Sequence, residues 1–209
     1  VAFIYEKTSA SSAWTYSHEL GRLHLNEVFP DDVTTVYYDS INSHNIEEAI
    51  DDAIANGCNV IFTTSPTFSQ ASLKAAIANP KITILNCSLH DPHTSMRTYY
   101  ARMHEAKFIM GAVAGSMASH DKIVYIADYP IYGTIANINS FAQGVKMTNP
   151  RAKIHLLWSC LKDVDVEEQI KQLQPDCVSD KDLSVPEAGT RYYGLYMSYP
   201  DSIWNLAIP

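Results

Sequence analysis

Hydrogen-bonding side chains gather at five short stretches of this 209-residue sequence. The stretches are rich in hydroxyls, amides and carboxylates and hold few fixed charges; they are Tyr5–Ser9, Thr63–Phe68, Asn86–Ser88, Ala127–Tyr129 and Ser179–Asp182. Groups of this kind suit hydrogen bonding to a neutral polar solute. The five stretches therefore indicate a small-molecule ligand.

Motifs that mark catalysis are missing from the sequence. It contains no G-x-S-x-G nucleophile elbow, no G-x-G-x-x-G and no G-x-x-x-x-G-K-[ST], which disfavours hydrolase, dinucleotide and P-loop chemistry. His90-Asp91-Pro92-His93 brings two histidines and a carboxylate together, but Pro92 indicates a turn and no third ligand is spaced nearby. We expect a protein that is not an enzyme, with no cofactor and no metal.

The four cysteines are widely spaced and form no C-x-x-C pair: Cys58, Cys87, Cys160 and Cys177. Each lies at or beside an apolar strand, so we expect buried free thiols rather than a zinc site. Four free thiols would favour a reducing compartment.

Composition narrows the possible partners. The chain has 15 Lys+Arg against 23 Asp+Glu, a formal net charge of −8, and no basic cluster, so we expect no nucleic-acid partner. The longest uncharged apolar stretch, Phe108–Ala118, is too short to span a bilayer. The chain opens inside a strand-like segment, Val1–Tyr5, and stops directly after another. We therefore expect that upstream residues have been removed.

Each polar stretch follows a short apolar segment, and these segments alternate with helical patterns. We expect strands at 1–6, 33–38, 59–64, 82–86, 97–101, 122–127, 153–158, 176–179, 191–197 and 203–208. We expect helices at 14–28, 46–54, 69–78, 103–118, 134–147 and 164–173. Strands that are apolar on both faces and alternate with helices predict an α/β fold with parallel sheets. Ligands in such sheets bind beyond the C-terminal ends of the strands, where the polar stretches lie.

The segment 103–118 is apolar nearly all round, so we expect a helix that is buried on several sides. Gly111 and Gly115 lie one turn apart on it and would let another backbone approach closely.

Three stretches carry a resemblance to a known family: Ala13–Arg22, Ala106–Gly115, and Asn139–Lys146 with Asn149-Pro150. In order and spacing they resemble the basic membrane protein family of ABC-transporter solute-binding proteins, of the purine-nucleoside receptor type. The resemblance runs from Val1 to about Trp158. It implies a type I periplasmic-binding-protein-like fold, in which two α/β lobes with parallel sheets are joined by a hinge and hold the ligand in a cleft.

We expect the first lobe at residues 1–120 and the second at 121–209, with the crossing near Ser119–Asp121. The second lobe is expected to be shortened relative to the family. Only 16 residues separate Cys160 from Cys177, and we expect one helix of the family to be missing between Ser179 and Gly194.

The resemblance also implies ligand residues. Glu6 stands where relatives carry Asp, Thr15 where they carry Asn, and Asn86 where they carry an acidic residue; Asp182 matches a polar residue of the second lobe. Trp14 matches the aromatic residue that stacks on the base. With the strand-end positions added, the predicted ligand residues are Glu6, Trp14, Thr15, Ser65, Asn86, Ser88, Asp128 and Asp182.

Plainer interpretations stay open for several of these residues. Trp14 is otherwise a core anchor of its helix, although its place at the helix start beside the strand ends favours a ligand-facing role. Glu6 is otherwise a solvated strand-end charge, and Asn86 and Ser88 are otherwise turn residues.

Two functional hypotheses follow. The favoured one is a solute-binding protein that closes two lobes over a nucleoside or purine-like ligand. It would be an extracytoplasmic, membrane-anchored lipoprotein that delivers its ligand to an ABC permease. The alternative is a cytoplasmic ligand-sensing domain fused to an upstream domain, which the strand-like start and the four unpaired cysteines motivate. A lipobox signal upstream would support the first, and a folded domain without a signal the second.

Overall fold

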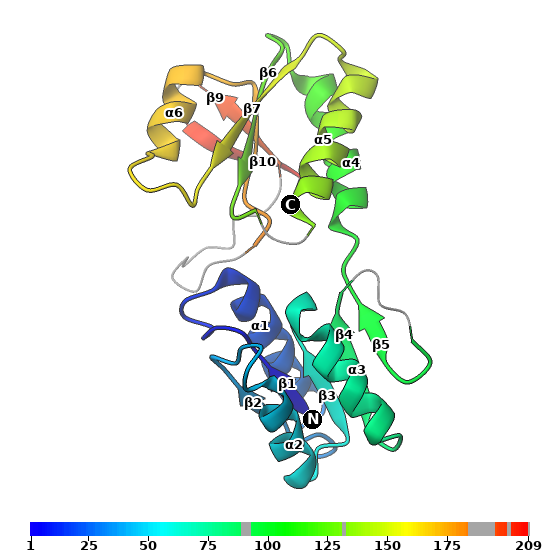
Figure 1. The fold of residues 1–209 in the computed structure, drawn as a ribbon. Helices are drawn as coiled ribbons and strands as arrows, with labels where there is room; N and C mark the ends of the chain where they lie inside the picture. The colour runs from blue at the N-terminus through cyan, green and yellow to red at the C-terminus, as the bar shows by residue number, and fades with distance from the viewer. Residues whose placement is uncertain (89–92, 131–132, 184–194, 200–201, 209) are drawn as a thin grey trace. The chain divides into compact units, whose positions relative to one another are not determined.

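The computed structural model describes residues 1–88, 93–130, 133–183, 195–199 and 202–208 (Figure 1). Contacts between Cα atoms divide these residues into two compact units, which we call unit 1 (1–101) and unit 2 (from Arg102 onward). The division falls after Ala101 and not at residue 120, where we had predicted it. The reason is α4 (Met103–Met117), which packs along α5 (Thr134–Thr148) and so belongs to the second unit.

Unit 1 is built on a five-stranded sheet of order β2-β1-β3-β4-β5, parallel throughout. Its strands are β1 (Ala2–Ile4), β2 (Val36–Tyr38), β3 (Val60–Thr63), β4 (Thr83–Cys87) and β5 (Arg97–Tyr99). Its helices are α1 (Ala13–Val28), α2 (Ile46–Ala55) and α3 (Ser69–Ala78), and a 3₁₀ turn, η1 (Pro66–Phe68), precedes α3. Because the strands are parallel, their C-terminal ends share one edge of the sheet.

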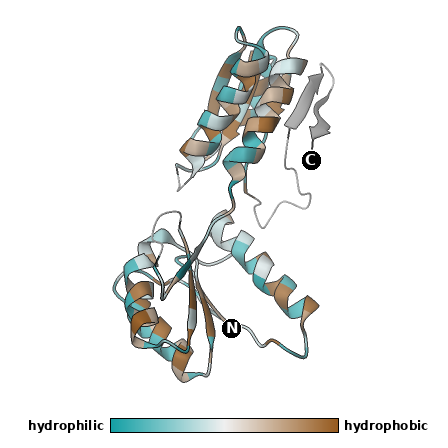
Figure 2. Ribbon diagram, turned by 90° about the vertical axis from the view of Figure 1, so that its right-hand side faces the viewer, coloured by the Kyte–Doolittle hydropathy of each residue, from teal (hydrophilic) through white to brown (hydrophobic). Residues whose placement is uncertain are grey.

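The core of unit 1 lies between the sheet and its helices. In α2 the residues at i, i+3, i+4 and i+7 are all buried: Ile46, Ala49, Ile50 and Ala53. They belong to one cluster with buried strand residues such as Ile4, Ile61 and Ile84. Figure 2 shows the same pattern, with mostly hydrophobic strands and helices banded in both colours.

Unit 2 holds a second five-stranded sheet, of order β10-β9-β8-β6-β7. Its strands are β6 (Lys122–Ala127), β7 (Lys153–Trp158), β8 (Cys177–Ser179), β9 (Leu195–Tyr199) and β10 (Ser202–Ile208). The side chains of β6 alternate between two layers. Tyr125 packs with Phe141 of α5, whereas Val124 and Ile126 pack with Ile170 of α6 (Val166–Leu173). The pair α4 and α5 therefore covers one face of the sheet and α6 the other (Figure 1).

The prediction of a parallel sheet in both lobes holds only in part for unit 2. β6 is parallel to β7 and β8, but β9 is antiparallel to β8 and to β10. Only residues 200–201 separate β9 from β10. Two strands joined so tightly can pair only in the antiparallel sense, because a parallel pair needs a crossover of a dozen or more residues.

Glycine allows α4 and α5 to pack backbone against backbone. A Cβ atom on Gly111 would overlap the carbonyl oxygen of Phe141, and one on Gly144 would overlap that of Phe108. The close approach predicted from Gly111 and Gly115 is thereby confirmed, and Gly144 of α5 is the counterpart that sequence reasoning missed.

The prediction that α4 is buried on several sides is wrong. Ile109 is 63 % exposed and Met103 is 40 % exposed. The helix lies in the outer layer of unit 2, where α5 and the sheet cover only part of its circumference. Among the described residues, no helix combines the length and hydropathy that a transmembrane span requires.

Candidate functional site

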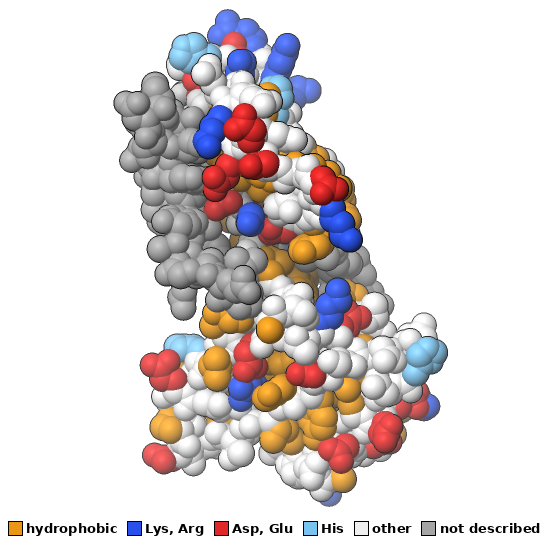
Figure 3. Space-filling view, turned by 90° about the vertical axis from the view of Figure 1, so that its left-hand side faces the viewer, with side chains coloured by type: hydrophobic (Ala, Val, Ile, Leu, Met, Phe, Trp, Pro, Cys, Tyr) orange, Lys and Arg blue, Asp and Glu red, His pale blue; other side chains and the backbone are white. Residues whose placement is uncertain are grey.

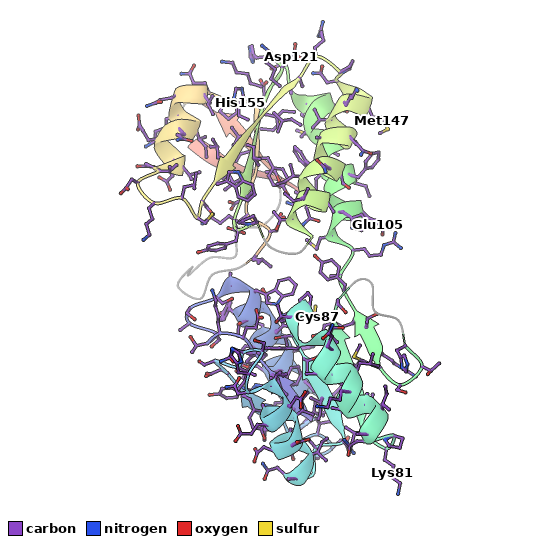
Figure 4. The ribbon with its side chains drawn as sticks, viewed as in Figure 1. Lys81, Cys87, Glu105, Asp121, Met147 and His155 are labelled. Carbon is purple, nitrogen blue, oxygen red and sulfur yellow. The ribbon has the colours of Figure 1, made fainter. Side chains whose placement is uncertain are left out.

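In unit 1 the parallel register brings the predicted strand-end residues to one edge of the sheet. Ile4, Thr63 and Asn86 lie in one row across β1, β3 and β4. Two positions beyond that row, each strand carries a residue of the predicted site: Glu6, Ser65 and Ser88. In Figure 4 this edge is marked by Cys87, at the end of β4.

Asn86 is fully buried, and only the nitrogen of its side-chain amide is hydrogen-bonded within the described chain. Its amide nitrogen donates to Thr63 Oγ1 at 2.9 Å and to the Ser65 carbonyl oxygen at 2.8 Å. Its Oδ1 atom has no hydrogen-bond partner within the described parts of the chain, and the same is true of Oγ of Ser88, which is 4 % exposed. A buried polar group without a partner costs about 1–3 kcal/mol. Both atoms therefore have a hydrogen-bonding capacity that the described residues do not use.

Glu6 and Ser65 are linked through Thr67. Glu6 is exposed and accepts a hydrogen bond from Thr67 Oγ1. Ser65 is buried; its Oγ accepts from the Thr67 amide at 3.2 Å and lies 2.9 Å from Thr67 Oγ1. The Ser65 hydroxyl thus caps η1, whereas part of the Glu6 side chain remains exposed to solvent.

Trp14 stands in the first turn of α1 and is half-buried. Its indole Nε1 donates to the Thr64 carbonyl oxygen at 2.7 Å, which holds the ring at the end of β3. The helix begins here because Ser12 Oγ accepts from the Thr15 amide at 3.2 Å. Thr15 itself is only 2 % exposed and lies in the interior of unit 1.

Sequence reasoning missed the other aromatic groups around Trp14. The Trp14 ring centroid lies 5.1 Å from that of His18 and 6.4 Å from that of Tyr100, and His18 lies 6.1 Å from Tyr99. Burial raises the pKa of Tyr99 and lowers the pKa of His18, so both rings are uncharged at neutral pH. The pair Tyr99-Tyr100 at the end of a predicted strand was the available signal.

In unit 2, Asp182 is held by three donors of the chain itself. Lys107 Nζ lies 2.5 Å from its Oδ1, and Tyr125 OH and Asn137 Nδ2 donate to its Oδ2 at 3.1 and 3.0 Å. Both carboxylate oxygens are thus engaged. Asp182 shapes this end of the sheet, and little of its carboxylate is left for a ligand.

Lys107 was absent from the predicted site. It is 2 % exposed, and besides Asp182 it donates to Ser179 Oγ at 3.2 Å and lies 5.2 Å from the centre of the Tyr125 ring. Burying an ammonium group is unfavourable unless a carboxylate and hydrogen-bond acceptors surround it, as they do here. In the sequence, the only indication was that this lysine lies in a helix that is otherwise largely apolar.

Asp128 and Asp180 follow the neighbouring strands β6 and β8. Asp128 Oδ1 accepts from Ser159 Oγ at 3.0 Å, whereas its buried Oδ2 has no partner within the described chain. Asp180, which was not among the predicted residues, is 7 % exposed. Burial raises the pKa of both carboxyl groups.

A surface hollow of about 660 Å³ lies at the N-terminus of α6. Its lining residues are Ser159, Asp163, Val164, Asp165, Val166, Glu167 and Lys181. Ser159 joins it to Asp128 through their hydrogen bond. Figure 3 shows acidic side chains gathered on this side of the protein, with a few basic ones beside them.

The cysteines and the candidate metal ligands are spread over the described parts of both units. In the ranges that the structure covers, no three His, Cys, Asp or Glu side chains are close enough to hold a metal ion. His90 and Asp91 lie outside those ranges. The four cysteines form no disulfide among the described residues, and burial raises the pKa of Cys87 and of Cys177 to about 11.

A known protein family matches most of this chain. Residues 1–170 match the Bmp family, described as ABC transporter substrate-binding protein PnrA-like. The chain belongs to this family. The membership that Ala13–Arg22 and the other stretches predicted is thereby confirmed.

Individual relatives of this Bmp-family chain are distant. It is 28% identical over 159 residues to a purine-binding protein of Brucella abortus, which is 76% of this chain and 45% of the relative. It is 22% identical over 157 residues to TsgA13, a putative ABC transporter glucose-binding protein of Haloferax volcanii, which is 75% of this chain and 40% of the relative. The chain thus spans less than half the length of these two relatives.

Solved structures share the fold. An ABC transporter solute-binding protein from Conexibacter woesei superimposes with a TM-score of 0.63 at 16% identity, over 83% of this chain and 59% of that one. The predicted fold class, an α/β fold of the solute-binding-protein type, is confirmed.

Proposed function

We propose that this Bmp-family protein binds a small, neutral, polar ligand at the C-terminal ends of its strands. The observation that carries the proposal is a set of buried polar atoms without partners in the described chain. Asn86 Oδ1 and Ser88 Oγ lie at the end of β4, and Asp128 Oδ2 follows β6. Open parallel sheets bind their ligands at this end of the strands.

A nucleoside or purine is the ligand class that we favour. The Brucella relative is named as a purine-binding protein, and Trp14 offers a half-buried aromatic ring beside the strand ends. An aromatic ring can stack on a base, while amide and hydroxyl groups bond the edges of the base and the sugar. A sugar is the second candidate, because the Haloferax relative is named as a putative glucose-binding protein.

Binding would act by shifting a conformational equilibrium. A ligand that touches both units only when they are closed favours the closed arrangement by its difference in affinity for the two states. This mechanism needs no catalytic group, in keeping with a substrate-binding family.

We further propose that the protein is an extracytoplasmic lipoprotein that hands its ligand to an ABC permease. The family description supports the role in ABC transport within this proposal. The competing proposal is a cytoplasmic ligand-sensing domain joined to an upstream domain. The sequence of the complete gene separates them, since a lipobox signal supports the first and a folded domain without a signal supports the second.

Two measurements test the ligand proposal. Mass spectrometry of small molecules released from the purified protein should find a purine or nucleoside. Isothermal titration calorimetry with adenosine, guanosine and glucose should then show saturable binding of at least one nucleoside and none of glucose. Binding of glucose alone would replace the nucleoside by a sugar, and the absence of any binding would refute the proposed function.

A further inference from the structure

The helix α2 ends in the one Asn-Gly pair of the sequence, Asn56-Gly57. Gly57 has a φ of +82°, the left-handed conformation that commonly ends a helix and that glycine adopts without strain. Asn56 is the C-cap residue and is exposed to solvent. Because Gly57 has no side chain, nothing on it shields its backbone nitrogen from the side-chain amide of Asn56. The two residues that end α2 are therefore also a pair that can deamidate.

Deamidation of such a pair proceeds through a cyclic imide. The Gly57 nitrogen attacks Cγ of Asn56, and the Cγ–Nδ2 bond breaks as the new C–N bond forms. The amide nitrogen leaves as ammonia and takes the proton of the Gly57 nitrogen with it. Water then opens the ring at either carbonyl and leaves aspartate or isoaspartate. The net change is hydrolysis of an amide to a carboxylate, with water as the only co-reactant.

The folded structure holds this pair away from the reactive geometry. Asn56 has a ψ of 11°, so the Gly57 nitrogen nearly eclipses the backbone nitrogen of Asn56, whereas ring closure requires it to lie beside Cβ. The Gly57 N–H donates to the Ile54 carbonyl oxygen at 2.9 Å. The Asn56 amide is held as well, since its Nδ2 donates at 2.9 Å to Asp52 Oδ2, which also accepts from Tyr38 OH at 2.8 Å. Attack therefore requires the last turn of α2 to open.

A carboxylate at position 56 would weaken the turn that protects the amide. Its oxygen would stand where Nδ2 donates to Asp52, so a hydrogen bond would become a repulsion between like charges at i and i+4. The last turn of α2 has no basic residue, and the helix dipole disfavours negative charge at this end. Cys58 follows directly; it is 7 % exposed, and its amide donates to the Ala53 carbonyl oxygen at 3.0 Å. Loosening the turn would therefore expose the Cys58 thiol.

We propose that Asn56 is a site of spontaneous deamidation, that opening of the α2 C-terminus controls its rate, and that the product keeps this helix end loosened. The change runs in one direction, because ammonia leaves the protein, and it accumulates as the molecule ages. The inference is independent of the proposed function, since it involves only α2, β2 and the turn that leads into β3.

The test is peptide mapping by mass spectrometry after incubation at mildly alkaline pH, in buffer and in urea. Asn56 should convert in both, and on the order of 10-fold faster in urea, where no helix end has to open first. Asn42, which is also exposed but is followed by Ser43, is the internal control and should convert far more slowly than Asn56 in urea.

Two variants test the control by the helix end. Asp52→Ala removes the acceptor of Asn56 Nδ2 and should raise the rate in buffer toward the rate in urea. Asp51→Ala removes the same charge from the same helix and should leave the rate in buffer unchanged. A third variant, Asn56→Asp, reproduces the product. It should melt at a lower temperature than the wild type at neutral pH, and a maleimide should label its Cys58 faster, as read on the Cys58 peptide.

Each part of the proposal can fail separately. No conversion of Asn56 in urea would overturn the site itself. Equal rates in buffer and in urea, or equal acceleration by Asp51→Ala and Asp52→Ala, would overturn the control by the helix end. An Asn56→Asp variant that melts and labels like the wild type would overturn the effect assigned to the product.

Discussion

At the scale of single residues, Trp14 combines two features that are seldom found together in a core anchor. Its ring is half-buried, and its indole nitrogen is fixed by a hydrogen bond of 2.7 Å to the backbone of Thr64. The hydrogen bond sets the orientation of the ring, and the exposed part of the ring is available for stacking. Orientation and exposure together are what a binding platform requires.

Replacing Trp14 by alanine should abolish nucleoside binding and leave the melting temperature of the ligand-free protein nearly unchanged. Trp14→Phe should keep part of the binding, because a ring remains without the indole N–H. Calorimetry and thermal melting measure the two effects. Phe141→Ala is the comparison for a fully buried ring, with an expected loss of about 3–5 kcal/mol. A loss of that size in Trp14→Ala would assign Trp14 to the core.

Asp180→Asn should raise the melting temperature at pH 7. Burial raises the pKa of Asp180 above its unfolded value, so the unfolded chain loses this proton at lower pH than the folded protein does. The carboxyl group therefore reduces stability progressively as pH rises from the unfolded pKa, about 4, through the folded pKa. Thermal melts across this range should show the gain of the variant growing with pH. A gain that is equal at all pH values would contradict the argument.

At the scale of secondary-structure elements, a polar contact and a backbone contact hold unit 2 together. Asp176, just before β8, accepts hydrogen bonds from Ser119 Oγ, from the backbone and Nδ1 of His120, and from the Lys122 amide. It thereby ties the turn between α4 and β6 to the neighbouring strand. The second contact is the glycine seam between α4 and α5.

Asp176→Ala should destabilise the protein by about 1–3 kcal/mol at pH 7, because the backbone donors of the turn lose their acceptor. Burial alone would raise the pKa of Asp176, but the hydrogen bonds from His120, Lys122 and Ser119 outweigh it and hold the pKa below its usual value. This contribution is present above the unfolded pKa and is lost as pH falls through the folded pKa. Urea unfolding at neutral and acidic pH should show the wild type approaching the variant in acid, and a constant difference would refute the linkage.

Gly144→Ala should cost about 1–3 kcal/mol or more, since its Cβ atom would overlap backbone atoms of Phe108 and Ala112. Gly21→Ala is the matched control: Gly21 lies in the exposed part of α1 with open space around it, so alanine there should stabilise by about 0.5–1 kcal/mol. Chemical denaturation of both variants checks the pair. Equal effects would mean that the helices tolerate a wider separation.

At the scale of the whole molecule, each unit has its own sheet and its own hydrophobic clusters, and the chain passes from one to the other after Ala101. Two cores with a short connection permit relative motion of the units. Among the predicted ligand residues, the first unit contains Glu6, Trp14, Asn86 and Ser88, and the second contains Asp128 and Asp182.

Saturating adenosine should therefore reduce the radius of gyration measured by small-angle X-ray scattering and raise the melting temperature, because it stabilises the closed arrangement. An unchanged scattering curve together with calorimetric binding would mean that one unit binds the ligand without closure.

Local patterns in the sequence were enough to locate the elements and the edge of the site. Apolar strands, the helical period of residues such as Ile46 and Ile50, and the glycines of α4 report burial and packing through nearest neighbours, so they can be read without a structure. The polar strand ends at Glu6, Ser65 and Asn86 could be predicted for the same reason, since parallel strands must end together.

Only the tertiary structure decided which polar group is free and which is already bonded. Asp180 and Asp182 look alike in the sequence, but Lys107, Tyr125 and Asn137 converge on Asp182 from distant parts of the chain and leave Asp180 without them. Likewise, α4 joined unit 2 because its glycines face α5, which no local pattern on α4 specifies. The pairing of buried charges and the partner of a helix face depend on where remote segments meet, and that is settled by packing of the whole domain.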